Sequence, residues 1–165
     1  MLAKQALSQE TRDMTREFET LADLKAAVGQ ELGTSDWVTV TQEKINLFAD
    51  ATGDHQWIHV DPDAAAKGPF GKTIAHGYLT LSLLPVFTEQ IYGVKSAVMG
   101  VNYGANKVRF PHPVPVDSRV RATATLKETQ DISIGTQVII SVVVEIDGVE
   151  KPACIAEVVY VIAEG

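Results

Sequence analysis

The sequence predicts an α+β domain in which an antiparallel sheet wraps around one buried helix. Residues 75–91 are apolar on nearly all sides through their first three turns, which is typical of a helix in the interior of a domain. From residue 94 onward the chain is rich in β-branched side chains with partial alternation, which predicts strand after strand. The chain has 165 residues, of which 45% are hydrophobic, so it is long enough for one domain with its own core.

The chain before the central helix begins with a polar stretch. Residues 1–17 show no apolar stripe, so we expect a tail there and a single domain over residues 18–165. Residues 18–28 carry apolar side chains at steps of three and four, which predicts a short amphipathic helix. Residues 37–40 are then expected to form a short strand.

A second helix is expected over residues 42–51, because Thr41 is a suitable N-cap and Gly53 follows the last apolar position. Residues 54–60 have no periodic apolar pattern and are expected to form an irregular loop. Asp61 and Pro62 then predict the N-cap and first residue of a single-turn helix through residue 66.

The central helix and the strands after it complete the predicted fold. Pro85 is expected to bend or weaken the helix, because proline lacks the backbone N–H and its ring clashes with the preceding turn. Asp147-Gly148 is a strong signal for a hairpin turn, and residues 133–135 are expected to form another. The strands are expected over residues 94–103, 107–110, 118–130, 136–146 and 152–163.

Composition and charge exclude several classes of function. Lys and Arg number 14 against 21 Asp and Glu, and this acidic balance disfavours broad binding to nucleic acid or to an anionic membrane surface. The longest apolar stretch, residues 78–87, is too short to span a bilayer, and the N-terminus lacks the apolar segment of a signal peptide. We therefore expect a cytoplasmic protein.

The single cysteine, Cys154, lies in an alternating apolar run and is expected to be a small buried hydrophobic residue.

Asp54 and His59 lie five residues apart in the expected loop. Loops held by flanking helices commonly carry chemistry, and a carboxylate with an imidazole can bind one water, remove a proton from it and return a proton to carbon. The spacing alone has a second reading, in which Asp54 caps the loop and His59 lies on the surface.

His76 and Gly77 stand near the predicted start of the central helix. A helix start presents unpaired N–H groups and the positive end of the helix dipole, and glycine lets a ligand come close to the backbone. Such donors suit an oxygen that gains negative charge during a reaction. The alternatives are that Gly77 only permits close packing of the helix and that the His76 imidazole only holds the turn in place.

The motifs together are more specific than either alone. They are A-T-G-D-x-x-x-x-H (residues 51–59), F-G-x-x-I-A-H-G-Y-L (70–79) and N-Y-G-x-N-K-V-R-F-x-x-P-V-P-V (102–116). In this order they resemble the R-specific enoyl-CoA hydratases of the MaoC-like dehydratase family. The resemblance covers about residues 37–161.

This resemblance implies a hotdog fold, with a curved antiparallel sheet around a central helix. It implies syn addition of water to a trans-2-enoyl-CoA, which gives an R-3-hydroxyacyl-CoA without a metal or redox cofactor. By motif position, Asp54 and His59 are the water-activating pair, and the Gly77 N–H is the donor to the thioester carbonyl. A single hotdog repeat also implies a homodimer with the sheets joined edge to edge.

The chain departs from the family pattern at two places. Gln56 and Trp57 stand where the family has Asn-Pro, so both are expected to contact substrate in a loop of altered geometry. Pro85 stands where some members carry a helix serine, eight residues after the oxyanion glycine.

The remaining substrate contacts are expected from His76 and from the third motif. Backbone contacts to the pantetheine arm are expected from Asn102, Tyr103 and Gly104. Contacts to the coenzyme A phosphates are expected from Lys107 and Arg109, and also from Arg119 and Arg121. The alternative is that these cations form the solvated face of alternating strands. No spacing of His and acidic residues puts three metal ligands on one rigid element, so no metal is expected.

Two other functions remain open from the sequence. A hotdog acyl-CoA thioesterase would share the fold and the ligand, although it would not need the Asp54 and His59 pair. A non-catalytic acyl-CoA-binding or partner subunit is the other alternative.

Overall fold

The sheet predicted from the C-terminal half of the chain is the largest element of the structure, a computed structural model that describes residues 15–165. Its strands are β2 (Glu31–Thr34), β5 (Ala97–Arg109), β6 (Arg119–Ile132), β7 (Gly135–Ile146) and β8 (Val149–Glu164). They follow the order β2-β6-β7-β8-β5, and each neighbouring pair is antiparallel. The predicted meander is thus confirmed, except that the two strands expected over residues 94–103 and 107–110 form the one strand β5.

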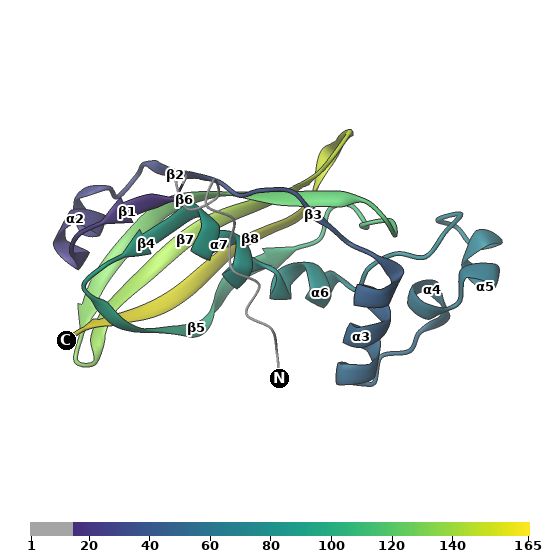
Figure 1. Cartoon of the computed structure of the whole chain (residues 1–165), viewed down its shortest axis with the longest axis horizontal. Coiled ribbons are helices and arrows are strands. Elements are labelled where there is room, and N and C mark those ends of the chain that lie inside the picture. Colours follow the sequence, from purple (N-terminus) through teal and green to yellow (C-terminus); the bar gives the residue numbers. More distant parts are fainter. Residues whose placement is uncertain (1–14) are drawn as a thin grey trace.

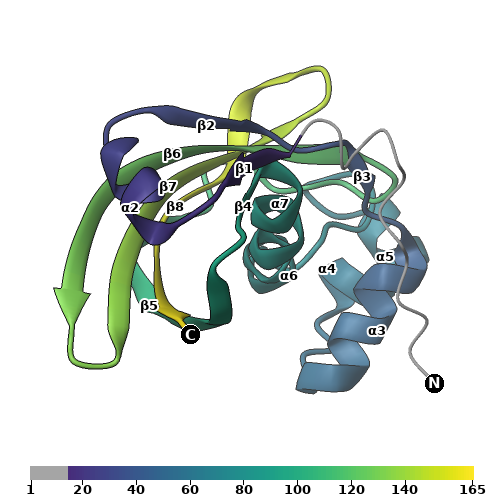
Figure 2. The same ribbon diagram turned by 60° about the vertical axis from the view of Figure 1, so that its left-hand side comes forward.

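Two helices, α6 (Gly77–Ser82) and α7 (Leu84–Ile91), lie inside the curve of this sheet (Figure 2). Alternate side chains of β6 and β7 face them, which gives both strands an alternating burial pattern. The core is formed mainly by Leu84, Phe87, Ile91, Val120, Leu126, Val138, Ile140, Val142 and Val144. The predicted α+β arrangement of a sheet around a central helix is therefore confirmed.

The central helix differs from its prediction at both its start and its middle. It begins at Gly77 and not at residue 75, because the Ala75 N–H donates to the Val114 carbonyl in an extended segment. It is also divided at Leu83, just before Pro85 in the first turn of α7. The break has the expected cause, since proline cannot donate to the carbonyl of the preceding turn.

The N-terminal part of the described chain contains strands that the sequence pattern did not predict. β1 (Arg16–Phe18) pairs in parallel with β4 (Tyr92–Val94). The amphipathic helix is shorter than expected, α2 (Leu21–Ala26), and starts at a capping box between Thr20 and Asp23. The tail predicted for residues 1–17 lies mostly outside the described residues, and the domain boundary at residue 18 stays a prediction.

Three helices form a separate group beyond the end of the sheet (Figure 1). α3 (Gln42–Thr52) follows the short strand β3 (Val38–Thr39) and is capped by Thr41 as predicted. α4 (Trp57–Val60) occupies the second half of the segment expected to be a loop, so that expectation holds for residues 54–56 and was wrong for residues 57–60. There the Asp61 N–H donates to the Trp57 carbonyl and closes a helical turn. α5 (Pro62–Ala66) agrees with the prediction.

A short extended segment ties this group to the rest of the fold. Ile74 forms an isolated antiparallel bridge with Pro115. The Val116 N–H donates to the Thr73 carbonyl (2.9 Å), and the Ala75 N–H donates to the Val114 carbonyl (2.8 Å). This joint between residues 73–75 and 114–116 therefore sets where α3 to α5 lie relative to the sheet.

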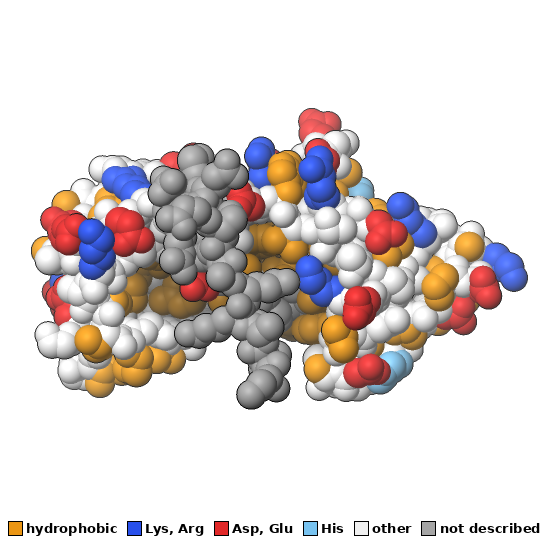
Figure 3. Space-filling model, viewed as in Figure 1, with side chains coloured by type: hydrophobic (Ala, Val, Ile, Leu, Met, Phe, Trp, Pro, Cys, Tyr) orange, Lys and Arg blue, Asp and Glu red, His pale blue; other side chains and the backbone are white. Residues whose placement is uncertain are grey.

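A hollow with largely hydrophobic walls opens on the face that carries α7 (Figure 3). It has a volume of about 630 Å³, and its lining includes Tyr92, Asn102, Tyr160 and Ile162. Among residues 15–165, no helix is long and apolar enough to cross a membrane.

Candidate active site

Asp54 is placed by the end of α3. Gly53 ends that helix in the left-handed conformation (φ 81°), which glycine adopts without strain. The chain then turns, and Asp54 Oδ1 accepts a hydrogen bond from the Gln56 N–H at 3.3 Å. The Asp54 side chain remains 56% exposed, so its second carboxylate oxygen is available to a ligand or a water.

His59 is placed by the helical turn α4 and is buried. Its Nδ1 lies 2.6 Å from the carbonyl oxygen of Ile74. A carbonyl only accepts hydrogen bonds, so Nδ1 carries the proton and the neutral ring keeps its lone pair at Nε2. The Gln42 side chain donates to the main-chain carbonyl of His59 at 2.7 Å and holds α4 against α3.

His76 is the residue before α6 and is 3% exposed. Its Nε2 donates to the main-chain carbonyl of Asp54 at 2.9 Å and lies 4.0 Å from the Asp54 carboxylate. Its ring stacks on the His59 ring, with the centroids 3.8 Å apart and the planes inclined by 24°. The Phe48 ring lies 5.0 Å from that of His76.

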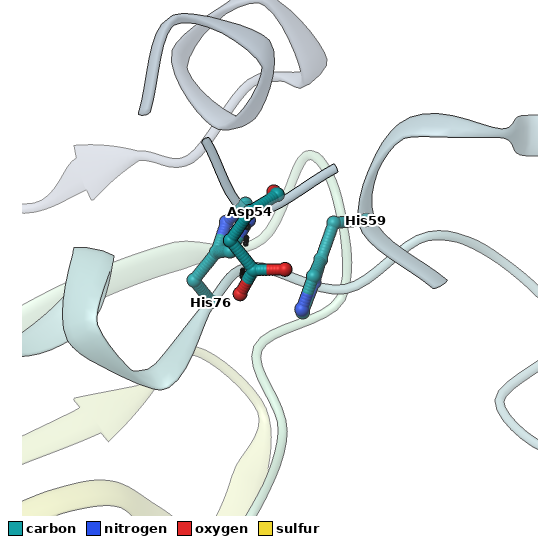
Figure 4. Close-up of side chains that lie close together, drawn as sticks. All are labelled: Asp54, His59 and His76. Atoms are coloured by element: carbon teal, nitrogen blue, oxygen red, sulfur yellow. Dashed lines mark hydrogen bonds and ion pairs between the residues drawn. The ribbon is translucent and has the colours of Figure 1, made fainter. Parts of the chain in front are cut away.

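Asp54, His59 and His76 thus meet at one place (Figure 4). Each offers an oxygen or nitrogen atom within 4.8 Å of the others. A water that makes two hydrogen bonds of about 2.8 Å can bridge atoms at this separation. The arrangement suits a water held between a carboxylate and an imidazole.

The environment of His59 favours its neutral form. Burial away from solvent lowers the pKa of His59 below its ordinary value of 6.5, and the neighbouring His76 lowers that pKa further. The hydrogen bond to Ile74 and the Asp54 charge act in the opposite direction without overcoming burial. A neutral imidazole with a lone pair at Nε2 can act as a base near neutral pH.

A pocket of about 260 Å³ adjoins His59 and Gly77. Gly77 is the first residue of α6, where a backbone N–H has no partner within the helix. The Phe110 ring covers this glycine so closely that a Cβ there would lie 2.9 Å from a ring carbon. The pocket is therefore lined by both a base and a helix start.

The same three residues do not form a suitable metal site. Lone pairs of imidazoles lie in the ring planes, and two stacked rings direct theirs side by side instead of toward one ion. In addition, Nε2 of His76 carries a proton that it donates to a carbonyl.

The structure brings Asp54, His59, His76 and Gly77 together, but it places the other predicted site residues elsewhere. Gln56 and Trp57 do not line this pocket, and the Trp57 ring packs against Gly68. Asn102 lines the larger hollow beside α7. Tyr103, Gly104, Lys107 and Arg109 are exposed on β5, outside both pockets. Their roles stay predictions.

Two of the candidate phosphate-binding cations are already paired. Arg119 forms an ion pair with Asp147, and Arg121 forms one with Glu145. Both arginines also lie over the Trp37 ring. This favours the alternative in which they belong to the polar face of the sheet.

Sequence reasoning missed two residues that build the site, Gln42 and Phe110. Gln42 accepts a hydrogen bond from Thr73 while it donates to His59, so it links three segments. Phe110 forms a wall of the pocket over Gly77. In the sequence, Gln42 is indistinguishable from any polar residue at a helix start. Phe110 could have been found, because it belongs to the third motif.

Comparisons with known proteins agree with this arrangement. A 3-hydroxyacyl-thioester dehydratase Z from Mycobacterium tuberculosis is 62% identical over 143 residues, which cover 86% of this chain and 95% of that protein. Nodulation protein N from Rhizobium leguminosarum bv. viciae is 47% identical over 148 residues, which cover 87% of this chain and 91% of that protein.

A solved R-hydratase from Pseudomonas aeruginosa has the same fold, with a TM-score of 0.68 at 22% identity over 84% of this chain and 83% of that one. The hotdog fold implied by the sequence motifs is thereby confirmed. Residues 23–147, which include Asp54, His59, His76 and Gly77, match the family described as MaoC like domain. The chain belongs to this family of MaoC-like dehydratase domains.

Proposed function

We propose that this protein catalyses the reversible, R-specific hydration of a trans-2-enoyl-CoA to an R-3-hydroxyacyl-CoA. At the coarser level it is a hydro-lyase of the 3-hydroxyacyl-thioester dehydratase class, as its 62% identity to a protein of that name supports. The observation that carries the finer proposal is the approach of Asp54 and His59 within 4.8 Å of each other. His59 lines a pocket that reaches the start of α6.

In the proposed hydration, one water binds between Asp54 and His59. Nε2 of His59 takes a proton from this water as its oxygen bonds to C3 of the enoyl thioester. The electron pair of the double bond moves onto the thioester carbonyl and forms an enolate. Asp54 accepts a hydrogen bond from the second O–H of the water, which stays on the oxygen as the 3-hydroxyl, and so orients the lone pair that attacks.

Collapse of the enolate completes the addition. The proton held by the pair passes to C2, and the thioester carbonyl is restored. Oxygen and hydrogen add to one face of the double bond, because both come from the same side of the pocket. Dehydration is the same sequence in reverse.

The Gly77 N–H is the proposed donor to the carbonyl oxygen. A donor already aimed at the developing negative charge needs no reorganisation during the reaction. The positive end of the α6 dipole adds to this stabilisation. Gly77 also leaves room for the thioester beside Phe110, since a side chain at this position would meet the Phe110 ring.

The proposal includes a homodimer formed through β5. Among the described residues, β5 pairs with β8 on one side only, and it exposes Val98, Met99, Val101 and Tyr103. An exposed apolar edge strand is a template for pairing with another strand. Two copies of β5 paired about a two-fold axis form one continuous sheet.

This pairing would also bring different pockets of the two copies close together. Antiparallel strands place the Ala97 end of one copy beside the Arg109 end of the other. The hollow that contains Asn102 would then lie close to the His59 pocket of the second copy. This gives Asn102 and Tyr103 a place near substrate that they lack in one chain alone.

The test is turnover of crotonyl-CoA by the wild type and by Asp54→Asn and His59→Gln. Loss of the enoyl absorbance without release of free thiol is the expected result for the wild type, whereas thiol release would identify a thioesterase. A positioned base contributes roughly a hundredfold to ten-thousandfold, so each variant should fold normally and lose about that much kcat. Near-normal turnover in either variant would remove the proposal, and no reaction of the wild type with enoyl-CoAs of several lengths would favour a partner subunit.

A further inference from the structure

We propose that His76 is a positioning residue that holds Asp54 and His59 at their working separation. The proposal rests on the function proposed above, which assigns water activation and proton transfer to Asp54 and His59. Its basis is that one imidazole contacts both partners in different ways. It donates a hydrogen bond to the backbone of the first and stacks its ring on the second.

The hydrogen bond anchors the loop that carries Asp54. That loop follows the left-handed Gly53, and the Asp54 side chain is largely exposed, so packing around the carboxylate does little to fix it. Nε2 of His76 reaches the Asp54 carbonyl at 2.9 Å from a residue 22 positions later in the chain. Because His76 directly precedes Gly77, the same bond sets the distance from the carboxylate to the start of α6.

The stacked ring restricts the movement of His59. The Nδ1 bond to the Ile74 carbonyl fixes one edge of the His59 ring, but the ring can still rock about that bond. The stacked His76 ring, with its centroid 3.8 Å away, blocks such rocking on one face. The Phe48 ring in turn supports His76. The lone pair at Nε2 of His59 is thereby aimed in one direction.

The stack also affects the charge state of His59. The titratable groups near His59 are Asp54 from the loop after α3 and His76 from the start of α6, and His112 lines the same pocket as His59. His76 lowers the pKa of His59, in addition to the larger effect of burial, while Asp54 raises that pKa. Removing the His76 imidazole should therefore raise the pKa of His59.

The other nitrogen of His76 supports a role beyond filling space. Nδ1 is buried and has no hydrogen-bond partner among the described residues. A buried polar atom without a partner is unfavourable, and such atoms are uncommon in folded proteins. A histidine here therefore carries the cost of an unpaired Nδ1. Its Nε2–H bond to Asp54 and its ring stacked on His59 are the contacts that explain why this side chain is present.

Two substitutions separate these contributions. His76→Phe keeps a ring to stack on His59 but has no donor for the Asp54 carbonyl, whereas His76→Gln keeps an amide N–H at a similar reach but has no ring. We expect His76→Phe to lower kcat roughly a hundredfold with little change in KM, as misplacement by about 1 Å does. His76→Gln should recover most of this loss and move the acid limb of the kcat profile to higher pH. His55→Gln is the matched control, since His55 is 53% exposed and pairs with Asp50.

Nuclear magnetic resonance of the histidine rings tests the proposal without turnover. In the resting wild type, His76 should carry its proton on Nε2, and the pKa of His59 should rise in His76→Gln but not in His55→Gln. An Nδ1–H tautomer of His76 in the wild type would overturn the proposal even if no variant folds. Unchanged kcat in His76→Phe, or an unchanged pKa of His59 in His76→Gln, would overturn it as well. An inactive wild type would count against the proposed function alone, because these ring measurements would still hold.

Discussion

Gly77→Ala tests how closely the pocket is built around the start of α6. Gly77 does not have a positive φ, so alanine is compatible with the backbone, and any effect must come from the added methyl group. That methyl carbon would lie 2.9, 3.0 and 3.1 Å from three ring carbons of Phe110. Carbon atoms prefer separations of roughly 3.5–4.0 Å, so the ring must move by about 0.6–1 Å.

The expected cost follows from the position of that ring. Overpacking in a core costs about 1–3 kcal/mol, and Phe110 is 40% exposed and can yield, so we expect the lower end, about 1 kcal/mol. The effect on activity should be larger, because the displaced ring forms a wall of a pocket of about 260 Å³. A shift of about 1 Å in a reacting geometry can cost roughly a hundredfold, which is the loss of kcat/KM that we expect.

The assay is urea unfolding together with crotonyl-CoA hydration, for Gly77→Ala, Phe110→Ala and the double variant. If the clash is the cause, Gly77→Ala should cost almost no stability in the Phe110→Ala background, and its effect on kcat/KM should shrink there too. Equal costs in the two backgrounds would refute the steric reasoning.

Three further predictions concern charge, packing and assembly. Because the pKa of His59 is lowered by folding, the unfolded chain binds a proton below pH 6.5 that the folded chain does not, so the free energy of unfolding should fall as pH falls through this range. In urea unfolding at several pH values, His59→Gln should weaken the dependence of the free energy of unfolding on pH. The same dependence in wild type and variant would contradict this prediction. Gly68→Ala places a methyl carbon 2.8 Å from the Trp57 ring, which is 44% exposed and can yield, so it should cost about 1 kcal/mol, a cost that Trp57→Ala should remove. Val101→Lys on the exposed face of β5 should yield a folded monomer in sedimentation velocity, and a wild type that is itself monomeric would exclude the proposed dimer.

Much of the fold follows from local patterns in the sequence. The strands β6 to β8 have alternating side chains joined by short turns, and hairpin pairing of neighbours requires no long-range information. The central helix could be predicted as well, because a segment that is apolar on nearly all sides must be covered by other elements. Pairings between distant segments were missed, as in the parallel pair of Arg16–Phe18 with Tyr92–Val94. Three-residue strands have no period that distinguishes them from loops.

The site was predictable where its residues stand close together in the chain. Asp54 and His59 lie five residues apart, and the motif around Gly77 marks a helix start. The stack of His59 on His76 and the bond from Gln42 to the His59 carbonyl arise from tertiary packing, which residue types alone do not reveal. The helical turn at residues 57–60 was missed because four residues are too few to show a helical period.

The joint between residues 73–75 and 114–116 gives the site a stability of its own. The carbonyl that orients His59 belongs to Ile74, the residue at the centre of this joint. Opening the joint would release the His59 ring while the long ladders of β6, β7 and β8 remain closed. Local openings of this kind require less free energy than global unfolding. Heat inactivation of this enzyme should therefore begin in a partly open state whose sheet is still intact, and the lifetime of its activity should be set by this joint more than by its core.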